Sequence, residues 1–150
     1  MGDQDYSEIL PGLYVGSCLA VDRLVRSGTV KRVVNCTAEL KNLSRIDEAS
    51  YLAVPLKDDG TYDDQAVFAD NVTNIMTFLD KESFDKSPVL LHCQMGVSRS
   101  PSVAAAYLLH TGKYEKVSEA KRFVKQMRPA SFEGDAKNTY DTALIEVFEF

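Results

Sequence analysis

The most informative segment of the chain reads Val89-Leu-Leu-His-Cys-Gln-Met-Gly-Val-Ser-Arg-Ser-Pro101. It opens with a short apolar run without alternation, which is typical of a strand buried on both faces of a parallel sheet. It leads into residues 100–110, which are apolar on nearly every side and therefore predict a buried helix. Pro101 fits the first turn of that helix, where a missing N–H costs nothing. The segment thus predicts a strand, a loop and a helix in succession.

The flanking segments predict an α/β fold. Apolar and β-branched residues between turn signals indicate further strands at 9–16 (two short strands around a Pro-Gly turn), 31–36 and 51–56. Capping residues or apolar residues at helical spacing indicate further helices at about 18–27, 68–79, 117–127 and 140–148. We therefore expect one domain over residues 1–150, with a central, mostly parallel mixed sheet of about five strands and helices on both faces.

Composition and charge narrow the class of protein. The chain has 150 residues, 45% of them hydrophobic, and no stretch approaches the roughly 20 apolar residues of a membrane span. Its three cysteines are irregularly spaced, which argues against a disulfide framework and for a reducing compartment. A net charge of -5 without a basic run disfavours nucleic acid and membranes as partners. We expect the protein in the cytoplasm, with the nucleus as a second location.

The loop between the predicted strand and helix has the features of an anion site. Ligands of open α/β sheets bind at the carboxyl ends of strands, and a helix N-terminus directs unpaired N–H groups at one point. Gly96 permits the backbone reversal that turns these groups inward. We expect the phosphate-binding residues to be Gln94, Met95, Gly96, Val97, Ser98 and Arg99.

Two side chains make this anion site a candidate catalytic site. Cys93 is the first loop residue, and the thiolate that would attack phosphorus is favoured by a helix N-terminus and by nearby cations. Arg99 follows six residues later, where its planar fork can bind two phosphate oxygens. The other cysteines lack such an arginine, since Leu24 follows Cys18 and Asn42 follows Cys36 at this spacing.

The segment from His92 to Ser100 resembles the signature loop of the dual-specificity protein phosphatases, within the Cys-x5-Arg superfamily. The resemblance extends over most of the chain, in Ile9–Gly16, Val33–Glu39, Val54–Asp58, Ala106–Leu109 and Arg128-Pro129. It fades after Pro129, where Ala130–Gly134 replaces the usual polar turn. It implies a small, atypical member without the kinase-docking domain of larger relatives.

The resemblance implies a metal-independent phosphatase, without a cofactor, that forms a cysteinyl-phosphate on Cys93. It implies phosphotyrosine and phosphoserine or phosphothreonine in proteins as substrates, although it identifies no particular partner. It also places the general acid at Asp58. On general grounds Asp58 and Asp59 would be a solvated turn, and Asp63 and Asp64 are weaker candidates, expected in the first turn of the following helix.

Two neighbours of the loop have alternative roles. A buried His92 would ordinarily bind nearby backbone, and the resemblance implies that it orders the loop and tunes the thiolate. Ser100 is a candidate N-cap, and the resemblance implies that it assists the thiolate as it leaves the phosphoenzyme.

Other substrates and functions remain open at this stage. An inositol lipid, an RNA 5'-phosphate or a glucan could be the substrate on the same scaffold, although the uncharged variable positions of the loop favour phosphoprotein. A module that binds phosphorylated segments without hydrolysis is a further alternative.

Cys36 has two interpretations. Its ordinary role is apolar packing at the end of a buried strand. In folds that the sequence resembles, however, the strands that end at Cys36 and at Cys93 are parallel neighbours, within reach of a disulfide. We therefore treat Cys36 as a candidate redox partner of Cys93.

Overall fold

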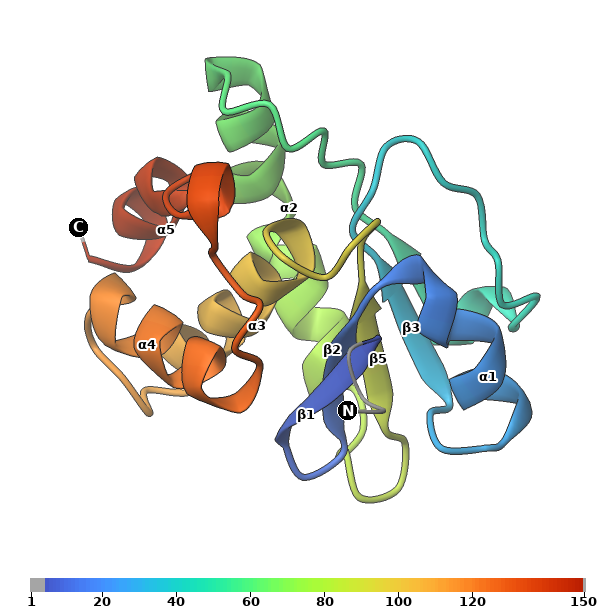
Figure 1. The fold of residues 1–150 in the computed structure, drawn as a ribbon. Helices are drawn as coiled ribbons and strands as arrows, with labels where there is room; N and C mark the ends of the chain where they lie inside the picture. Colours follow the sequence, from blue (N-terminus) through green and yellow to red (C-terminus); the bar gives the residue numbers. More distant parts are fainter. Residues whose placement is uncertain (1–4, 150) are drawn as a thin grey trace.

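The computed structural model describes residues 5–149 (Figure 1). The strands are β1 (Tyr6–Leu10), β2 (Leu13–Gly16), β3 (Arg32–Asn35), β4 (Tyr51–Ala53) and β5 (Val89–His92). The helices are α1 (Val21–Arg26), α2 (Tyr62–Asp80), α3 (Arg99–His110), α4 (Val117–Met127) and α5 (Asp141–Phe148). Short 3-10 turns cover Cys18–Ala20, Glu48–Ser50 and Gly134–Ala136.

The five strands form one sheet in the order β1-β2-β5-β3-β4. β1 is antiparallel to β2, and the remaining neighbours are parallel. All four residues of the central strand β5 are buried, as expected from its unalternating apolar sequence. The predicted mostly parallel mixed sheet is therefore confirmed.

Helices cover both faces of this sheet (Figure 1). Leu90 of β5 packs with Val21 and Leu24 of α1 on one face. Its neighbours Val89 and Leu91 belong to the larger core, to which α2, α3, α4 and α5 contribute. Alternate residues of one strand thus enter two separate cores, and the prediction of helices on both faces is confirmed.

Several predicted elements differ from the structure, and α2 begins at Tyr62, six residues before the first apolar residue of its pattern. The helix expected over 18–27 is a 3-10 turn followed by the short helix α1, with the Ser17 hydroxyl accepting from the Leu19 N–H as an N-cap. The strand expected over 51–56 ends at Ala53. The chain then leaves the sheet edge, because Pro55 has no N–H with which to continue the pairing, and it passes the loop between β5 and α3, where Asp58 accepts from Ser98, before it reaches α2. Among residues 5–149, no helix is long and apolar enough to cross a bilayer.

The register of the parallel strands brings their carboxyl ends together. Asn35 of β3 lies beside His92 of β5, and Gly16 of β2 lies on the other side of His92. The next residues along the chain, Cys36 and Cys93, therefore leave the sheet at the same edge. The Cys36 N–H donates to the carbonyl of His92 at 2.8 Å, which extends the pairing by one residue.

Candidate active site

Cys93 lies directly after β5 at the base of a pocket of about 440 Å³. Its side chain is a free thiol in a residue only 2% exposed. The pocket is also lined by Asp58, by every loop residue from Gln94 to Arg99 except Gly96, and by Glu133, Asp135, Ala136 and Thr139. The structure therefore brings Asp58, from the segment between β4 and α2, to the loop that carries both Cys93 and Arg99.

The loop between β5 and α3 is held by its carbonyl oxygens, which bind groups outside the loop. Consequently its N–H groups are turned to the opposite side, toward the pocket. The outward contacts are the Gln94 carbonyl with Cys18 N (3.1 Å), the Met95 carbonyl with Arg128 Nη2 (3.4 Å), the Gly96 carbonyl with Arg128 Nε (2.8 Å) and the Val97 carbonyl with Phe132 N (2.7 Å). This orientation suits an anion that accepts from several N–H groups at once.

Gly96 lies at the point where the loop reverses. Its φ of 72° is in the left-handed region, which favours glycine. A Cβ atom here would lie 2.7 Å from Arg128 Nη2 and 2.8 Å from the Gly16 carbonyl carbon. Only glycine therefore fits between the two groups that surround the loop.

The sulfur of Cys93 has two polar neighbours. The Gly96 N–H donates to Sγ at 3.3 Å, and the Ser100 hydroxyl lies 3.2 Å from Sγ. Ser100 also reaches the Gly16 carbonyl at 3.3 Å. The N-cap interpretation of Ser100 is wrong, because α3 begins at Arg99 and Ser98 occupies the cap position. The hydroxyl is directed instead at the sulfur.

Arg99 presents one free edge to the pocket. Nη1 donates to Glu39 Oε1 at 2.8 Å and to the Leu56 carbonyl at 2.9 Å, and Nη2 donates to Glu39 Oε2 at 2.9 Å. Nε is buried and has no partner among the described residues. Because a guanidinium has five N–H groups, the adjacent Nε–H and one Nη2–H remain. These two parallel donors match two oxygens of a phosphate.

The Arg99–Glu39 pair also fixes the charges at the site. Burial is the largest single effect and opposes the positive charge of Arg99, but the hydrogen bonds that Arg99 donates to Glu39, together with the negative charges of Cys93, Glu39 and Asp58, raise its pKa. The same bonds lower the pKa of Glu39. Both groups therefore stay charged over the neutral range.

His92 is fully buried beneath the loop. Its Nδ1 lies 3.3 Å from the carbonyl of Cys93, and since a carbonyl only accepts, Nδ1 carries the proton in this contact. Burial lowers the pKa of His92, which favours the neutral ring. This is the backbone contact expected of a buried histidine, and it joins the ring to the first residue of the loop.

Asp58 is the only one of the four acidic candidates whose carboxylate enters the pocket. Its Oδ1 accepts from the Ser98 hydroxyl at 2.6 Å, and it lines the same pocket as Cys93. Asp59 instead accepts from the N–H and hydroxyl of Thr61 in an exposed turn. Asp63 lies exposed in the first turn of α2. The placement therefore agrees with Asp58 as the expected acid.

A buried carboxylate and a tyrosine hold the backbone of Asp58. Asp64 accepts from the N–H groups of Lys57 at 2.8 Å and Asp58 at 2.9 Å. The Tyr140 hydroxyl donates to Asp64 Oδ2 at 2.6 Å and accepts from the Asp58 N–H at 2.9 Å. Burial, then the bond to Asp64, raises the pKa of Tyr140, so the hydroxyl remains a donor. These contacts keep Asp58 at a φ of 64°, which few non-glycine residues adopt.

Sequence reasoning missed four of these residues. From the sequence, Glu39 and Arg128 are only parts of matching segments, Asp64 is a weaker general-acid candidate in the first turn of a helix, and Tyr140 begins the helix expected over 140–148. One signal was available for Glu39, because an arginine at the start of an apolar helix needs an anionic partner. No local pattern distinguishes the other three.

Cys36 is fully buried beside the site. Its Sγ contacts the Val34 carbonyl at 3.8 Å. Burial raises the pKa of Cys36 well above its usual range, and the charge of Cys93 adds to this effect. The thiol therefore lies next to Cys93 in the protonated form. Within residues 5–149, no group of three or more His, Cys, Asp or Glu side chains is arranged to hold a metal ion.

Comparison with known proteins agrees with this geometry. A family model described as the dual specificity phosphatase catalytic domain matches residues 13–138. Protein-tyrosine-phosphatase IBR5 of Arabidopsis thaliana is 35% identical over 128 residues, which are 83% of this chain and 45% of that protein. Human dual specificity protein phosphatase 1 is 32% identical over 123 residues, 81% of this chain and 32% of that protein. The chain thus spans less than half the length of either relative.

The fold recurs in a solved structure. Human DUSP28 superposes with a TM-score of 0.76 at 23% identity, over 97% of this chain and 93% of that chain. The shared fold and the family match both include the Cys93 loop. The chain therefore belongs to the dual specificity phosphatase family.

Proposed function

We propose that the chain is a metal-independent protein phosphatase that hydrolyses phosphotyrosine and phosphoserine or phosphothreonine through a cysteinyl-phosphate on Cys93. The observation that carries this proposal is the sulfur of Cys93, which accepts from the Gly96 N–H at 3.3 Å and belongs to the same pocket as Arg99, whose Nε has no partner among the described residues. Such an arrangement holds the oxygens of a phosphate while placing the nucleophile behind phosphorus.

The first step transfers the phosphoryl group to sulfur. The thiolate of Cys93 forms a bond to phosphorus as the bond to the side-chain oxygen of the substrate breaks. Asp58 gives its carboxyl proton to that leaving oxygen. The loop N–H groups and the Nε and Nη2 donors of Arg99 hold the other three oxygens.

The second step releases inorganic phosphate. A water oxygen attacks phosphorus, the bond to sulfur breaks, and Asp58 accepts the proton of the water. The Ser100 hydroxyl, 3.2 Å from Sγ, donates to the departing thiolate. The enzyme returns to its starting state with Asp58 protonated.

The rim of the pocket favours a protein substrate. The loop's variable side chains are uncharged, and Met95 is 69% exposed, which suits contact with a polypeptide. The carboxylates of Glu133 and Asp135 also line the pocket. They would repel the several phosphates of an inositol lipid or the backbone of RNA. We therefore favour phosphorylated proteins over these substrates and over a glucan.

Phosphate release from an aryl phosphate in excess chelator tests the activity. We expect turnover by the wild-type protein, background turnover by Cys93→Ser, and a loss of about 10²–10³ in kcat for Arg99→Lys, which keeps the charge but not the fork. Acid quenching followed by mass spectrometry should show a phosphoryl group on the Cys93 peptide. Activity in Cys93→Ser, or loss with chelator that a divalent metal restores, would contradict the mechanism.

A matched panel tests the substrate class. It contains phosphotyrosine and phosphothreonine peptides, a phosphoinositide, an RNA 5'-phosphate and a phosphorylated glucan. We expect both peptides to be hydrolysed with higher kcat/KM than the other three. A non-protein substrate that exceeds every peptide would replace the protein substrate in this proposal. Binding without any hydrolysis would favour a recognition module.

A further inference from the structure

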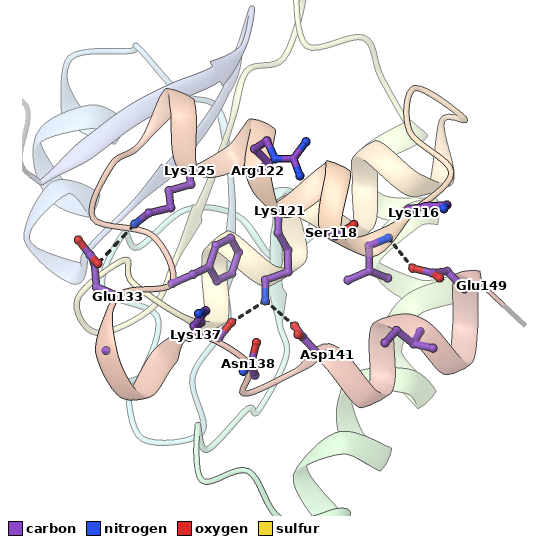
Figure 2. Close-up of a pocket in the computed structure, with 14 residues that line it drawn as sticks. Lys116, Ser118, Lys121, Arg122, Lys125, Glu133, Lys137, Asn138, Asp141 and Glu149 are labelled. Atoms are coloured by element: carbon purple, nitrogen blue, oxygen red, sulfur yellow. Dashed lines mark hydrogen bonds and ion pairs between the residues drawn. The ribbon is translucent and has the colours of Figure 1, made fainter.

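A second cavity, of about 750 Å³, lies between α4, the segment 132–138 and α5 (Figure 2). It is larger than the pocket above Cys93, and Glu133 lines both cavities. The second cavity therefore adjoins the candidate active site. We call it the α4–α5 groove, and the residues that matter here are Lys116, Lys121, Arg122, Lys125, Phe132 and Lys137.

The α4–α5 groove is cationic, whereas the chain as a whole carries a net charge of -5. Five lysine and arginine residues line it against three acidic residues, Glu133, Asp141 and Glu149. A local excess of positive charge on an acidic protein attracts acidic ligands to that surface.

Two of the lysines are held in place by carboxylates (Figure 2). Lys121 crosses the groove and donates to Asp141 and to the carbonyl of Lys137, each at 2.5 Å. Its Nζ lies 4.8 Å from the centre of the Phe132 ring. Lys125 Nζ lies 3.5 Å from a carboxylate oxygen of Glu133, at the border with the active site. These pairs give the groove a fixed shape without using its remaining cations.

The other cations are available to a ligand. Lys116, Arg122 and Lys137 are exposed, and their side chains have no ion-pair partner among the described residues. Apolar atoms of Val117, Phe132 and Ile145 also line the groove, and Ile145 is 47% exposed. The groove thus combines three unpaired cations with an apolar surface.

We propose that the α4–α5 groove binds an acidic segment of the phosphoprotein substrate that also carries an apolar residue. This inference rests on the proposed function, because the bound segment belongs to the same polypeptide as the phosphorylated residue above Cys93. Two linked contacts raise the effective concentration of the second. The groove would therefore select among phosphoproteins that the open catalytic pocket alone would not distinguish.

Matched phosphotyrosine peptides test the groove. One carries the flank Glu-Glu-Leu-Glu and the other Gln-Gln-Leu-Gln, each made with the flank before and after the phosphotyrosine. For the wild-type protein we expect kcat/KM for the acidic peptide to be about tenfold higher than for the neutral peptide, for one of the two flank positions. Two or three exposed ion pairs would give a difference of this size. Salt should reduce this ratio.

Charge reversal localises the effect. In Arg122→Glu/Lys137→Glu the ratio of acidic to neutral peptide should fall to one or below. The neutral peptide serves as the internal reference for any general loss of activity, and Arg122→Gln/Lys137→Gln gives an intermediate ratio. The matched control is Lys31→Glu/Lys86→Glu, which makes the same charge change at exposed positions just before β3 and β5. These positions lie at the amino ends of the strands, away from the groove, so this variant should keep the wild-type ratio.

The outcomes separate the two proposals. If the wild-type protein hydrolyses neither the aryl phosphate nor the neutral peptide, the proposed function fails, and binding of the unphosphorylated peptides by fluorescence anisotropy still tests the groove. A wild-type ratio near one with both flanks, together with equal binding of acidic and neutral peptides, overturns the docking inference. The docking inference is also overturned if Arg122→Glu/Lys137→Glu keeps the wild-type ratio of kcat/KM between the acidic and the neutral peptide. If the Arg122→Glu/Lys137→Glu substitutions weaken binding to phosphoinositide vesicles more than binding to any peptide, the groove binds a lipid headgroup instead, and the docking inference is wrong.

Discussion

The carboxylate of Glu39 binds the end of the Arg99 guanidinium through both of its oxygens, at 2.8 and 2.9 Å. This ion pair joins residues that are 60 positions apart in the sequence. It leaves the Nε–H and one Nη2–H of Arg99 free to face the pocket. Glu39 thus acts as a positioning residue, because it holds the guanidinium in the plane in which the remaining donors face a phosphate.

Glu39→Gln tests this positioning. An amide offers only one acceptor oxygen, and its NH₂ group faces an arginine nitrogen, so the free edge of Arg99 loses its fixed direction. We expect KM for an aryl phosphate and the Kd of vanadate to rise about fivefold, a modest effect because Glu39 is half exposed. Glu48→Gln, at an exposed position in the 3-10 turn before β4, is the control. An unchanged KM and Kd would show that Arg99 needs no such support.

The Asp58→Ala variant should lose far more kcat on a phosphotyrosine peptide than the Asp59→Ala variant. The carboxylate of Asp58 enters the pocket, whereas that of Asp59 binds Thr61 in a turn. General acid catalysis is worth about 10²–10⁴ in rate and matters least for good leaving groups. Asp58→Ala should therefore reduce kcat on a phosphotyrosine peptide more than on an activated nitroaryl phosphate. The reverse ranking of the two variants would move the acid by one residue.

Tyr140→Phe should act through Asp58. The substitution removes the hydroxyl that binds the Asp58 N–H and Asp64, while the ring keeps its stacking on Phe68 at 5.1 Å. We expect kcat on phosphotyrosine peptide to fall about tenfold and kcat on the activated aryl phosphate to change less, the signature of a displaced acid. Equal losses on both substrates, or a loss explained by a lower Tm, would indicate a purely structural role.

Mild peroxide should inactivate the protein reversibly through a Cys36–Cys93 disulfide. Peroxide oxidises the Cys93 thiolate to a sulfenic acid with release of water, and Cys36 then displaces a second water as the disulfide forms. The raised pKa of Cys36 means that this second reaction should accelerate as pH increases. Peptide mapping measures the disulfide, and Cys18 should remain free. Overoxidised Cys93 without a cross-link, or unchanged recovery by thiol in Cys36→Ser, would leave Cys36 as a packing residue.

The sequence alone determined the central strand, the loop and the buried helix. Val89–His92 has the predicted bounds, because an unbroken apolar run between a proline and a polar loop admits few other structures. The spacing of Cys93 and Arg99 and the place of Asp58 were also predictable, since each depends on residues near it in the chain or on a matching segment.

Only the tertiary structure decided which side chains support this site. Glu39, Asp64, Arg128 and Tyr140 come from separate loops and helices, and their contacts depend on how those elements pack. Local periodicity reports whether a residue faces the core, but it does not report which distant residue it meets there. Tyr140 has the spacing of a core residue, and its hydroxyl became a support for Asp58 only when α2 and α5 packed together.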